Sequence, residues 1–190
     1  MNKIIIIAGS PGSGKSTLMK SVKSNKYKIA NIGTLMEKEA AKKKYIDNRD
    51  QIRYLPNKTI KELRNLAFSE VSKLKGNIIL DTHASIAAKG RYLPGLPFES
   101  LKKLKNIIGF IYIDANTNEV LLRRIKDKTR IRENEDDHLI NTQRMMNLSA
   151  LFYYATYLNI SLHIINNRQD MLNKTVLKFN ETIENLFKTY

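Results

Sequence analysis

The sequence has no cysteine among its 190 residues, which excludes disulfide bonds and cysteine-ligated zinc and is typical of a protein in a reducing compartment. It also has no apolar run near the roughly 20 residues that a membrane-spanning helix needs. The apolar run at Ile4–Ile7 is too short for a signal peptide, so we expect none. These absences favour a cytoplasmic protein with no membrane partner.

Acidic residues are scarce: 18 Asp and Glu stand against 33 Lys and Arg, which gives a net charge of +15. Such an excess attracts polyanions, either nucleic acid or nucleotides. Lysine runs such as Lys42–Lys44 are more typical of a solvated surface. The sequence has neither zinc-finger spacing nor an aromatic-rich RNA-binding pattern, so a nucleic-acid partner is not expected.

Internal repeats, low-complexity tracts and Gly/Ser linkers are also absent. Together with a hydrophobic content of 42%, the length predicts a single domain over residues 1–190. Short apolar segments that read as strands alternate with helical periodicities, for example over Ile60–Leu74 and Leu172–Leu186. This alternation predicts an α/β fold, a parallel sheet with helices on both faces. The five expected strands are Ile4–Ala8, Tyr27–Ile32, Asn77–Leu80, Ile107–Ile113 and Ser161–Ile165.

Two stretches interrupt the alternation. Residues 34–65 are polar and helical in pattern, and they are longer than one crossover needs, so we expect an insertion there. Residues 126–138 have almost no apolar side chain and cannot pack by themselves. They form either a disordered loop or a lid that orders over a charged ligand, and their place opposite a phosphate loop favours the lid.

That phosphate loop is the most specific motif in the chain. The first strand leads into a G-x-x-x-x-G-K-[ST] pattern, and helical residues follow it, as the motif requires. Backbone N–H groups and the helix N-terminus make an anion cradle there. We expect Lys15, as an exposed loop cation, to reach the β- and γ-phosphates of ATP and the Ser16 hydroxyl to bind Mg²⁺. The expected ATP-binding residues are Gly9, Ser10, Pro11, Gly12, Ser13, Gly14, Lys15, Ser16 and Thr17.

A second signal is the acid that follows a buried strand, Asp81. Ligands of open α/β sheets bind at the carboxyl edge, so Asp81 is expected to hold the Mg²⁺ water shell rather than merely cap a turn. His83 is expected to be a hydrogen-bonded structural residue.

Arginines form two clusters that could clamp phosphates. Arg49 and Arg53 are four residues apart within the first insertion, so both could face one side of a helix. The other candidates lie around the second stretch: Arg123, Arg124, Arg130, Arg132 and Arg144.

These residues resemble the archaeal-type adenylate kinases over nearly the whole chain. The most specific piece, Asp81-Thr82-His83-Ala84 followed by Tyr92-Leu93-Pro94-Gly95-Leu96-Pro97, is similar to the family's D-T-H-A and Y-L-P-G-L-P segments. Further likenesses are Asn31-Ile32-Gly33-Thr34, Arg49-Asp50-Gln51-Ile52-Arg53 (R-D-x-[IM]-R) and Thr129-Arg130-Ile131-Arg132 (T-R-x-R).

The resemblance implies a three-layer P-loop kinase fold with a five-stranded sheet in the order 2-3-1-4-5, a mononucleotide-binding arm at 34–65 and a short lid at 126–138. It also implies the reaction ATP + AMP ⇌ 2 ADP, Mg²⁺ as cofactor, and commonly a homotrimer. The implied catalytic residues are Lys15, Asp81, Arg124, Arg130 and Arg132, with Arg124 preferred to Arg123 and Arg144 nearest to an arginine that relatives carry at about Leu148. The implied AMP-binding residues are Thr34, Arg49, Arg53, Tyr92 and Gly95.

The sequence therefore predicts an adenylate kinase that transfers the terminal phosphoryl of MgATP to AMP. Alternatives are a related ATPase that assists ribosome assembly and a P-loop kinase for another small acceptor. A GTP switch is rejected because no N-K-x-D guanine motif is present.

Overall fold

The computed structural model describes residues 2–23, 25–88, 91–127 and 137–190, and its centre is a five-stranded parallel sheet. The strands are β1 (Lys3–Gly9), β2 (Lys28–Asn31), β3 (Asn77–Asp81), β6 (Ile107–Asp114) and β7 (Ser161–Asn166). They lie in the order β2-β3-β1-β6-β7. Counted as core strands, this is the expected order 2-3-1-4-5; the labels differ because a short hairpin intervenes in the chain.

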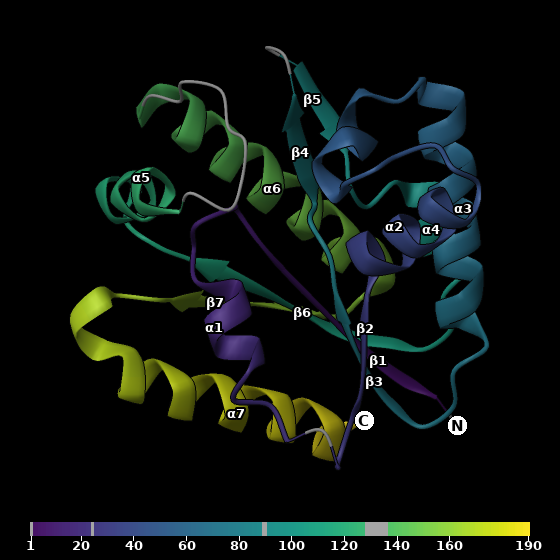
Figure 1. Ribbon diagram of the computed structural model, residues 1–190. Helices are drawn as coiled ribbons and strands as arrows, with labels where there is room; N and C mark the ends of the chain where they lie inside the picture. Colours follow the sequence, from purple (N-terminus) through teal and green to yellow (C-terminus); the bar gives the residue numbers. More distant parts are fainter. Residues whose placement is uncertain (1, 24, 89–90, 128–136) are drawn as a thin grey trace.

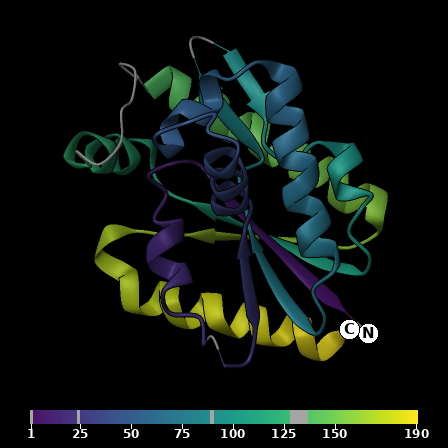
Figure 2. The ribbon, with the colours of Figure 1, turned by 45° about the vertical axis from the view of Figure 1, so that its right-hand side comes forward.

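Helices cover both faces of the sheet (Figures 1 and 2). On one face lie α1 (Lys15–Met19) and α7 (Leu172–Thr189). On the other lie α2 (Ile32–Lys42), α3 (Asn57–Ser72), α4 (Phe98–Leu101) and α6 (Asp137–Leu158). The helix α5 (Thr117–Lys126) packs beside α6. The fold class predicted from the sequence is confirmed.

Strand β1 shows how the sequence builds these layers. Alternate strand residues point to opposite faces, so Ile4 and Ile6 join the cluster under α3 and α6. Ile5 and Ile7 join the cluster under α1 and α7 instead. All four are at most 2% exposed, and burying each contributes about 1.5–3 kcal/mol. A run of four isoleucines therefore indicates a strand that is buried on both faces.

The predicted insertion at 34–65 begins inside α2 and ends inside α3. Between these helices lies η1, a 3-10 helix over Arg49–Tyr54. Asn48 caps η1 through its side chain and forms a capping box with Gln51. Of the predicted lid at 126–138, residues 128–136 lie outside the described part of the chain.

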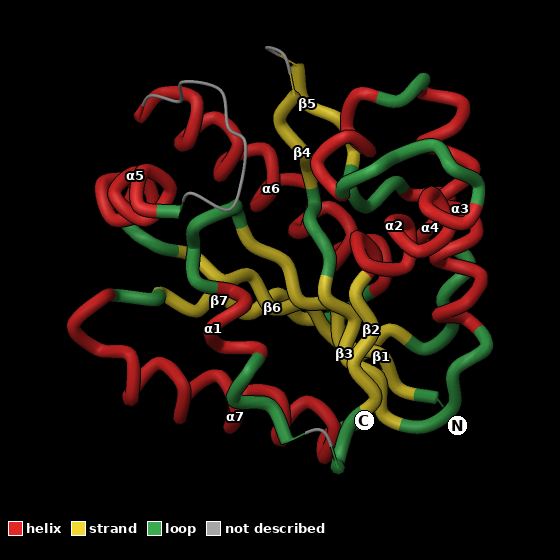
Figure 3. Tube along the Cα trace, viewed as in Figure 1, coloured by secondary structure: helices red, strands yellow, loops and turns green. Residues whose placement is uncertain are grey.

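An antiparallel hairpin was not predicted. It pairs β4 (Ser85–Ala88) with β5 (Arg91–Pro94) and stands apart from the main sheet (Figure 3). It contacts η1 and α6, so it forms one wall of the cavity described below. No helix in the described residues has the length and apolar character needed to cross a bilayer.

Candidate active site

The phosphate loop joins β1 to α1 at the carboxyl edge of the sheet. Gly12 and Gly14 have φ values of 85° and 87°, in the left-handed region that favours glycine. A Cβ on Gly14 would also overlap the side-chain amide of Asn167. The two glycines thus let the loop turn sharply and pack closely against the end of β7.

Side chains from elsewhere in the chain bind the carbonyl groups of this loop. The Asn167 amide donates to the Ser13 carbonyl at 2.8 Å. Arg124 donates through Nε to the Pro11 carbonyl at 2.7 Å, and Arg123 approaches the Gly12 carbonyl at 3.4 Å. Both arginines thus contact the loop, but Arg123 lines the cavity, whereas Arg124 is 6% exposed and is not part of its lining.

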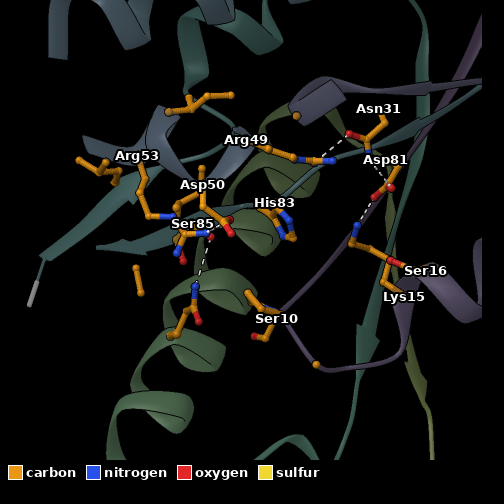
Figure 4. Close-up of a pocket in the computed structure, with 18 of the residues that line it drawn as sticks. Ser10, Lys15, Ser16, Asn31, Arg49, Asp50, Arg53, Asp81, His83 and Ser85 are labelled. Atoms are coloured by element: carbon orange, nitrogen blue, oxygen red, sulfur yellow. Dashed lines mark hydrogen bonds and ion pairs between the residues drawn. The ribbon is translucent and has the colours of Figure 1, made fainter. Parts of the chain in front are cut away.

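Four polar side chains form a connected row along the cavity wall (Figure 4). Lys15 and Asp81 form an ion pair in which both side chains are at most 10% exposed. The Asn31 amide donates to the second Asp81 oxygen at 2.6 Å, and Arg49 donates to the Asn31 side-chain oxygen at 3.2 Å. The row links the phosphate loop, the ends of β2 and β3, and η1. The expectation that Lys15 is an exposed loop cation is wrong, because Lys15 is buried against Asp81.

His83 lines the cavity beside the phosphate loop and, as expected, its side chain is hydrogen-bonded. Burial, together with the nearby Lys15 charge, lowers its pKa to about 4. The ring is therefore neutral at pH 7, and its Nδ1–H donates to the Gly9 carbonyl at 3.2 Å.

The acceptor-arm arginines reach the same cavity. Arg53 forms an ion pair with Asp50 at 2.9 Å. Both Arg49 and Arg53 line the cavity, although η1 is a 3-10 helix and not the α-helix that their spacing suggested.

Three other predicted acceptor residues do not line the cavity. Thr34 accepts a hydrogen bond of 3.5 Å from Arg49. Tyr92 donates to the Leu139 carbonyl at 3.3 Å, and the Gly95 amide donates to the Ala84 carbonyl at 2.9 Å. Their neighbours Gly33 and Leu93 line the cavity instead.

The cavity has a volume of about 530 Å³ and joins the phosphate loop to the acceptor arm. Its apolar wall comes from Met36, Ile52, Ile60, Ile86 and Leu93. Its polar lining includes Ser10, Lys15, Ser16, Asn31, Arg49, Asp50, Arg53, Arg64, Asp81, His83, Ser85, Arg123 and Gln143.

A buried polar network supports the loop from the side of α6, and no pattern in the sequence predicts it. Asn147 donates to the Ser10 hydroxyl at 3.2 Å and accepts from the Ser85 hydroxyl at 2.6 Å. Tyr112 lies 3.0 Å from the same Ser10 hydroxyl. Gln143 donates to the Ser85 carbonyl at 3.3 Å. Isolated Asn, Gln, Ser and Tyr residues form no recognisable motif in the sequence. The network is therefore identified only when the fold brings these side chains together.

Arg144 belongs to a different contact. Its guanidinium donates to both Asp114 oxygens, at 2.7 and 2.5 Å, and so ties α6 to the end of β6. This pair raises the pKa of Arg144. Arg144 is not part of the cavity lining. The predicted residues Arg130 and Arg132 lie outside the described residues.

The donor set at the carboxyl edge fits a magnesium ion that arrives with a nucleotide. Ser16 and Asp81 both line the cavity and offer a hydroxyl and a carboxylate, the hard oxygen ligands that Mg²⁺ prefers. Within the described ranges no group of three or more His, Cys, Asp or Glu side chains could hold a metal ion. Such a set suits an ion bound through one or two protein oxygens and the phosphates of its substrate.

Comparison with known proteins agrees with this geometry. A family model described as an AAA domain matches residues 8–141. The chain is 34% identical over 185 residues to the adenylate kinase of Methanothermobacter thermautotrophicus, covering 96% of this chain and 100% of that one. It is 38% identical over 173 residues to the adenylate kinase of Pyrococcus horikoshii, covering 88% and 87%.

Solved structures are similar in fold. The shikimate kinase of Bacteroides thetaiotaomicron aligns with a TM-score of 0.59 at 15% identity, covering 96% of this chain and 98% of that one. The shikimate kinase of Acinetobacter baumannii aligns with a TM-score of 0.55 at 13% identity, covering 97% and 94%. At these identities the likeness concerns the fold alone, whereas the archaeal sequences cover nearly the whole chain. The chain belongs to the archaeal-type adenylate kinase family.

Proposed function

We propose that this protein reversibly transfers the terminal phosphoryl group of MgATP to AMP, giving two ADP. As a member of the adenylate kinase family it is a P-loop nucleoside monophosphate kinase. The main support for two nucleotide substrates is that both proposed phosphate-binding regions line one cavity. A phosphate loop lines one part of it, and arginines from a separate arm line another. This arrangement suits a donor and an acceptor phosphate that meet inside one site.

On the donor side, Gly9–Thr17 would hold the phosphates of ATP. The Lys15 ammonium would balance charge on the β- and γ-oxygens. Arg124 and Arg123 would fix the loop through its carbonyl groups, as their hydrogen bonds to Pro11 and Gly12 suggest. Pre-positioned donors of this kind stabilise a transition state because they need no reorganisation during the reaction.

On the acceptor side, Arg53 would bind the phosphate of AMP, with Asp50 fixing its position through their ion pair. Arg49 would assist it, since its contacts to Asn31 and Thr34 hold it at the cavity wall. The apolar wall that includes Ile52 and Leu93 offers a surface for a flat base. Thr34, Tyr92 and Gly95 remain proposed acceptor residues, and their contacts suggest that they shape the arm and the hairpin.

Mg²⁺ is the proposed cofactor, and Ser16 and Asp81 would hold it. When bound, it would neutralise negative charge on the phosphates of ATP. The protein supplies no covalent intermediate, and catalysis rests on positioning and on electrostatic stabilisation.

Arg130 and Arg132 are proposed to complete the site, on the basis of the sequence alone. In the segment 126–138 they would bring guanidinium groups to the transferring phosphoryl. Closing this segment over the cavity would exclude water, which would otherwise hydrolyse ATP.

A coupled assay tests the proposal. Purified protein is given MgATP with and without AMP, and ADP and phosphate are measured separately. We expect two ADP per AMP consumed and little phosphate release without AMP. The Lys15→Ala variant serves as the inactive control. Phosphate release that is unaffected by AMP, with no net transfer, would instead indicate an ATPase of the assembly-factor type.

We also propose a cytoplasmic location and a homotrimeric assembly. The lack of cysteine and the use of nucleotides favour the cytoplasm. The family resemblance favours a homotrimer, which light scattering coupled to gel filtration would test.

A further inference from the structure

Arg64 is an unusual residue of the cavity. It lies on α3, is 7% exposed, and lines the cavity shared by the two proposed nucleotides. Burial lowers its pKa. Three other arginines line the same cavity, and each has a partner: Arg49 binds Asn31, Arg53 binds Asp50 and Arg123 binds Glu119. Within the described ranges, Arg64 has neither a hydrogen bond nor an ion pair.

Such a residue is costly to the fold. A guanidinium stays charged in a protein, and it is unfavourable for it to lose most of its hydration without gaining a partner. The Arg64 nitrogens are not among the fully buried polar atoms without a partner, so they keep some contact with the cavity that Arg64 lines. The same face of α3 is otherwise apolar, with Ile60, Leu63, Ala67 and Phe68 all buried. An apolar residue would therefore pack at this position without the cost. A group that enters the cavity and accepts hydrogen bonds would offset it.

The surroundings of Arg64 indicate which part of a nucleotide would supply the group that accepts its hydrogen bonds. Ile60, one turn earlier on α3, and Met36 on α2 line the cavity as well, and helices α2 and α3 pack together. An apolar wall of this kind suits the flat ring of a base. The phosphate of the acceptor already has Arg53 on η1, an arginine fixed by Asp50.

The chemistry of arginine then selects among bases. A guanidinium has five N–H donors and no acceptor, so it matches an edge with two neighbouring acceptor atoms. Guanine presents O6 and N7 in this way. Cytosine presents its neighbouring N3 and O2 when it is not base-paired. In adenine the N6 amino donor lies between N1 and N7, and N3 has no second acceptor beside it, so the base can take only one of the two hydrogen bonds. Uracil separates its two carbonyl oxygens by an N–H donor.

We propose that Arg64 reads the base of the acceptor nucleotide and extends acceptor use from AMP to GMP and CMP. The inference rests on the proposed function, because it assigns a base-recognition residue to the same acceptor site. It makes Arg64 a determinant of specificity and gives it no part in the transfer of the phosphoryl group.

Two variants and one matched control test this role. Arg64→Gln supplies an amide, which can both accept from and donate to adenine. Arg64→Met keeps most of the side-chain volume without donors. Lys61→Gln makes the same change of charge on the exposed side of the same helix. Initial rates with AMP, GMP, CMP and UMP at saturating MgATP give kcat/KM for each acceptor, and calorimetry gives the Kd of each monophosphate without ATP.

We expect the unmodified protein to use GMP and CMP within about 100-fold of AMP, and UMP less well. Arg64→Gln should lower kcat/KM for GMP and CMP relative to AMP by about 10- to 100-fold, the discrimination typical of one bidentate arginine–base contact. Arg64→Met should also lower kcat/KM for GMP and CMP relative to AMP. Lys61→Gln should leave kcat/KM for all four acceptors unchanged. Thermal unfolding establishes that each variant is folded.

The inference is overturned if Arg64→Gln lowers kcat/KM for all four acceptors by the same factor. That result would mean that Arg64 contacts the phosphate that the acceptors share and not the base. It is also overturned if the ranking of acceptors does not change, which would make the role structural. A protein that phosphorylates no monophosphate refutes the proposed function instead, and the calorimetric ranking of GMP, CMP and AMP in the variants still tests Arg64.

Discussion

Lys15 and Asp81 form a buried ion pair between the phosphate loop and the end of β3, the strand adjacent to β1. Each group has the charge that suits its proposed ligand, since Lys15 would meet the phosphates and Asp81 the metal. Asn31 holds the second carboxylate oxygen, so the carboxylate remains oriented through a neutral partner. The pair therefore couples the stability of the sheet edge to the groups that would bind MgATP.

Lys15→Ala should abolish phosphoryl transfer and also destabilise the fold. Its charge on the β- and γ-oxygens is expected to be worth at least about 100-fold in kcat. Removal of one partner leaves Asp81 buried and unpaired, which typically costs about 3–5 kcal/mol. The coupled assay measures the first effect, and urea unfolding measures the second.

The double variant Lys15→Ala/Asp81→Asn separates the two effects. Removing the uncompensated carboxylate charge should restore most of the lost stability and none of the activity. If the double variant is as unstable as Lys15→Ala, the ion pair is not what stabilises this edge of the sheet. Near-normal turnover in Lys15→Ala would refute the assignment of the phosphate loop.

Arg53→Ala should weaken the use of AMP far more than the binding of ATP. Arg53 lines the cavity from η1, an element separate from the phosphate loop, and its removal leaves that loop intact. Loss of a charged contact to phosphate is expected to cost about 1.5–3 kcal/mol, or roughly 10- to 150-fold in AMP affinity. Separate titrations with AMP and with MgATP measure this. Equal losses for the two nucleotides would contradict a two-site arrangement.

Asn147→Ala should disturb the phosphate loop from behind. Asn147 is 1% exposed, and its amide bonds both Ser10 and Ser85. Leaving the buried Ser10 hydroxyl and the half-buried Ser85 hydroxyl each one partner short should cost about 1–3 kcal/mol of stability. The KM for ATP should rise because Ser10 belongs to the loop, while the affinity for AMP should change less. Ser149→Ala, on the same helix outside this network, is the control. An unchanged KM for ATP would mean that the network stabilises α6 alone.

Much of the fold could be predicted from local patterns. The isoleucine run at Ile4–Ile7 is buried on both faces, which only an interior parallel strand requires, and the helical spacing of Phe179 and Ile183 marks the core side of α7. The β4–β5 hairpin was not predictable in this way. Ser85–Ala88 is short and Ile86 is its only large apolar side chain, and its pairing depends on contacts with η1 and α6 that are distant in sequence.

In the site, too, locally determined features were predictable and features that depend on tertiary contacts were not. The phosphate loop and Asp81 were predictable because a strand end and a glycine pattern fix their geometry locally. The pairing of Lys15, the network around Asn147 and the contact of Asn167 with the loop all depend on how separate elements meet. The buried position of Arg64 was likewise not predicted, because an arginine inside an amphipathic helix reads as a surface residue until the cavity is known.

Arg130→Lys and Arg132→Lys should each lower turnover while leaving the net charge unchanged. The prediction rests on the sequence, because both residues lie outside the described part of the chain. Lysine keeps the positive charge but loses the planar group that contacts two phosphate oxygens at once. We expect kcat to fall by about 10- to 1000-fold, as for other lost transition-state contacts. The control is Arg168→Lys, an exposed arginine outside the cavity lining, which should retain full activity.

A second measurement tests whether the segment 126–138 closes over the nucleotides. The positive charges of Arg130 and Arg132 repel one another, and a bisubstrate analogue with five linked phosphates supplies the opposing charge. Amide hydrogen exchange across the segment should therefore slow when the analogue is bound. In the two lysine variants the protection should persist in part, because charge is retained, even as turnover drops. Exchange that does not change at saturation would leave closure to the arm at 34–65, and normal turnover in both variants would remove these arginines from the proposed site.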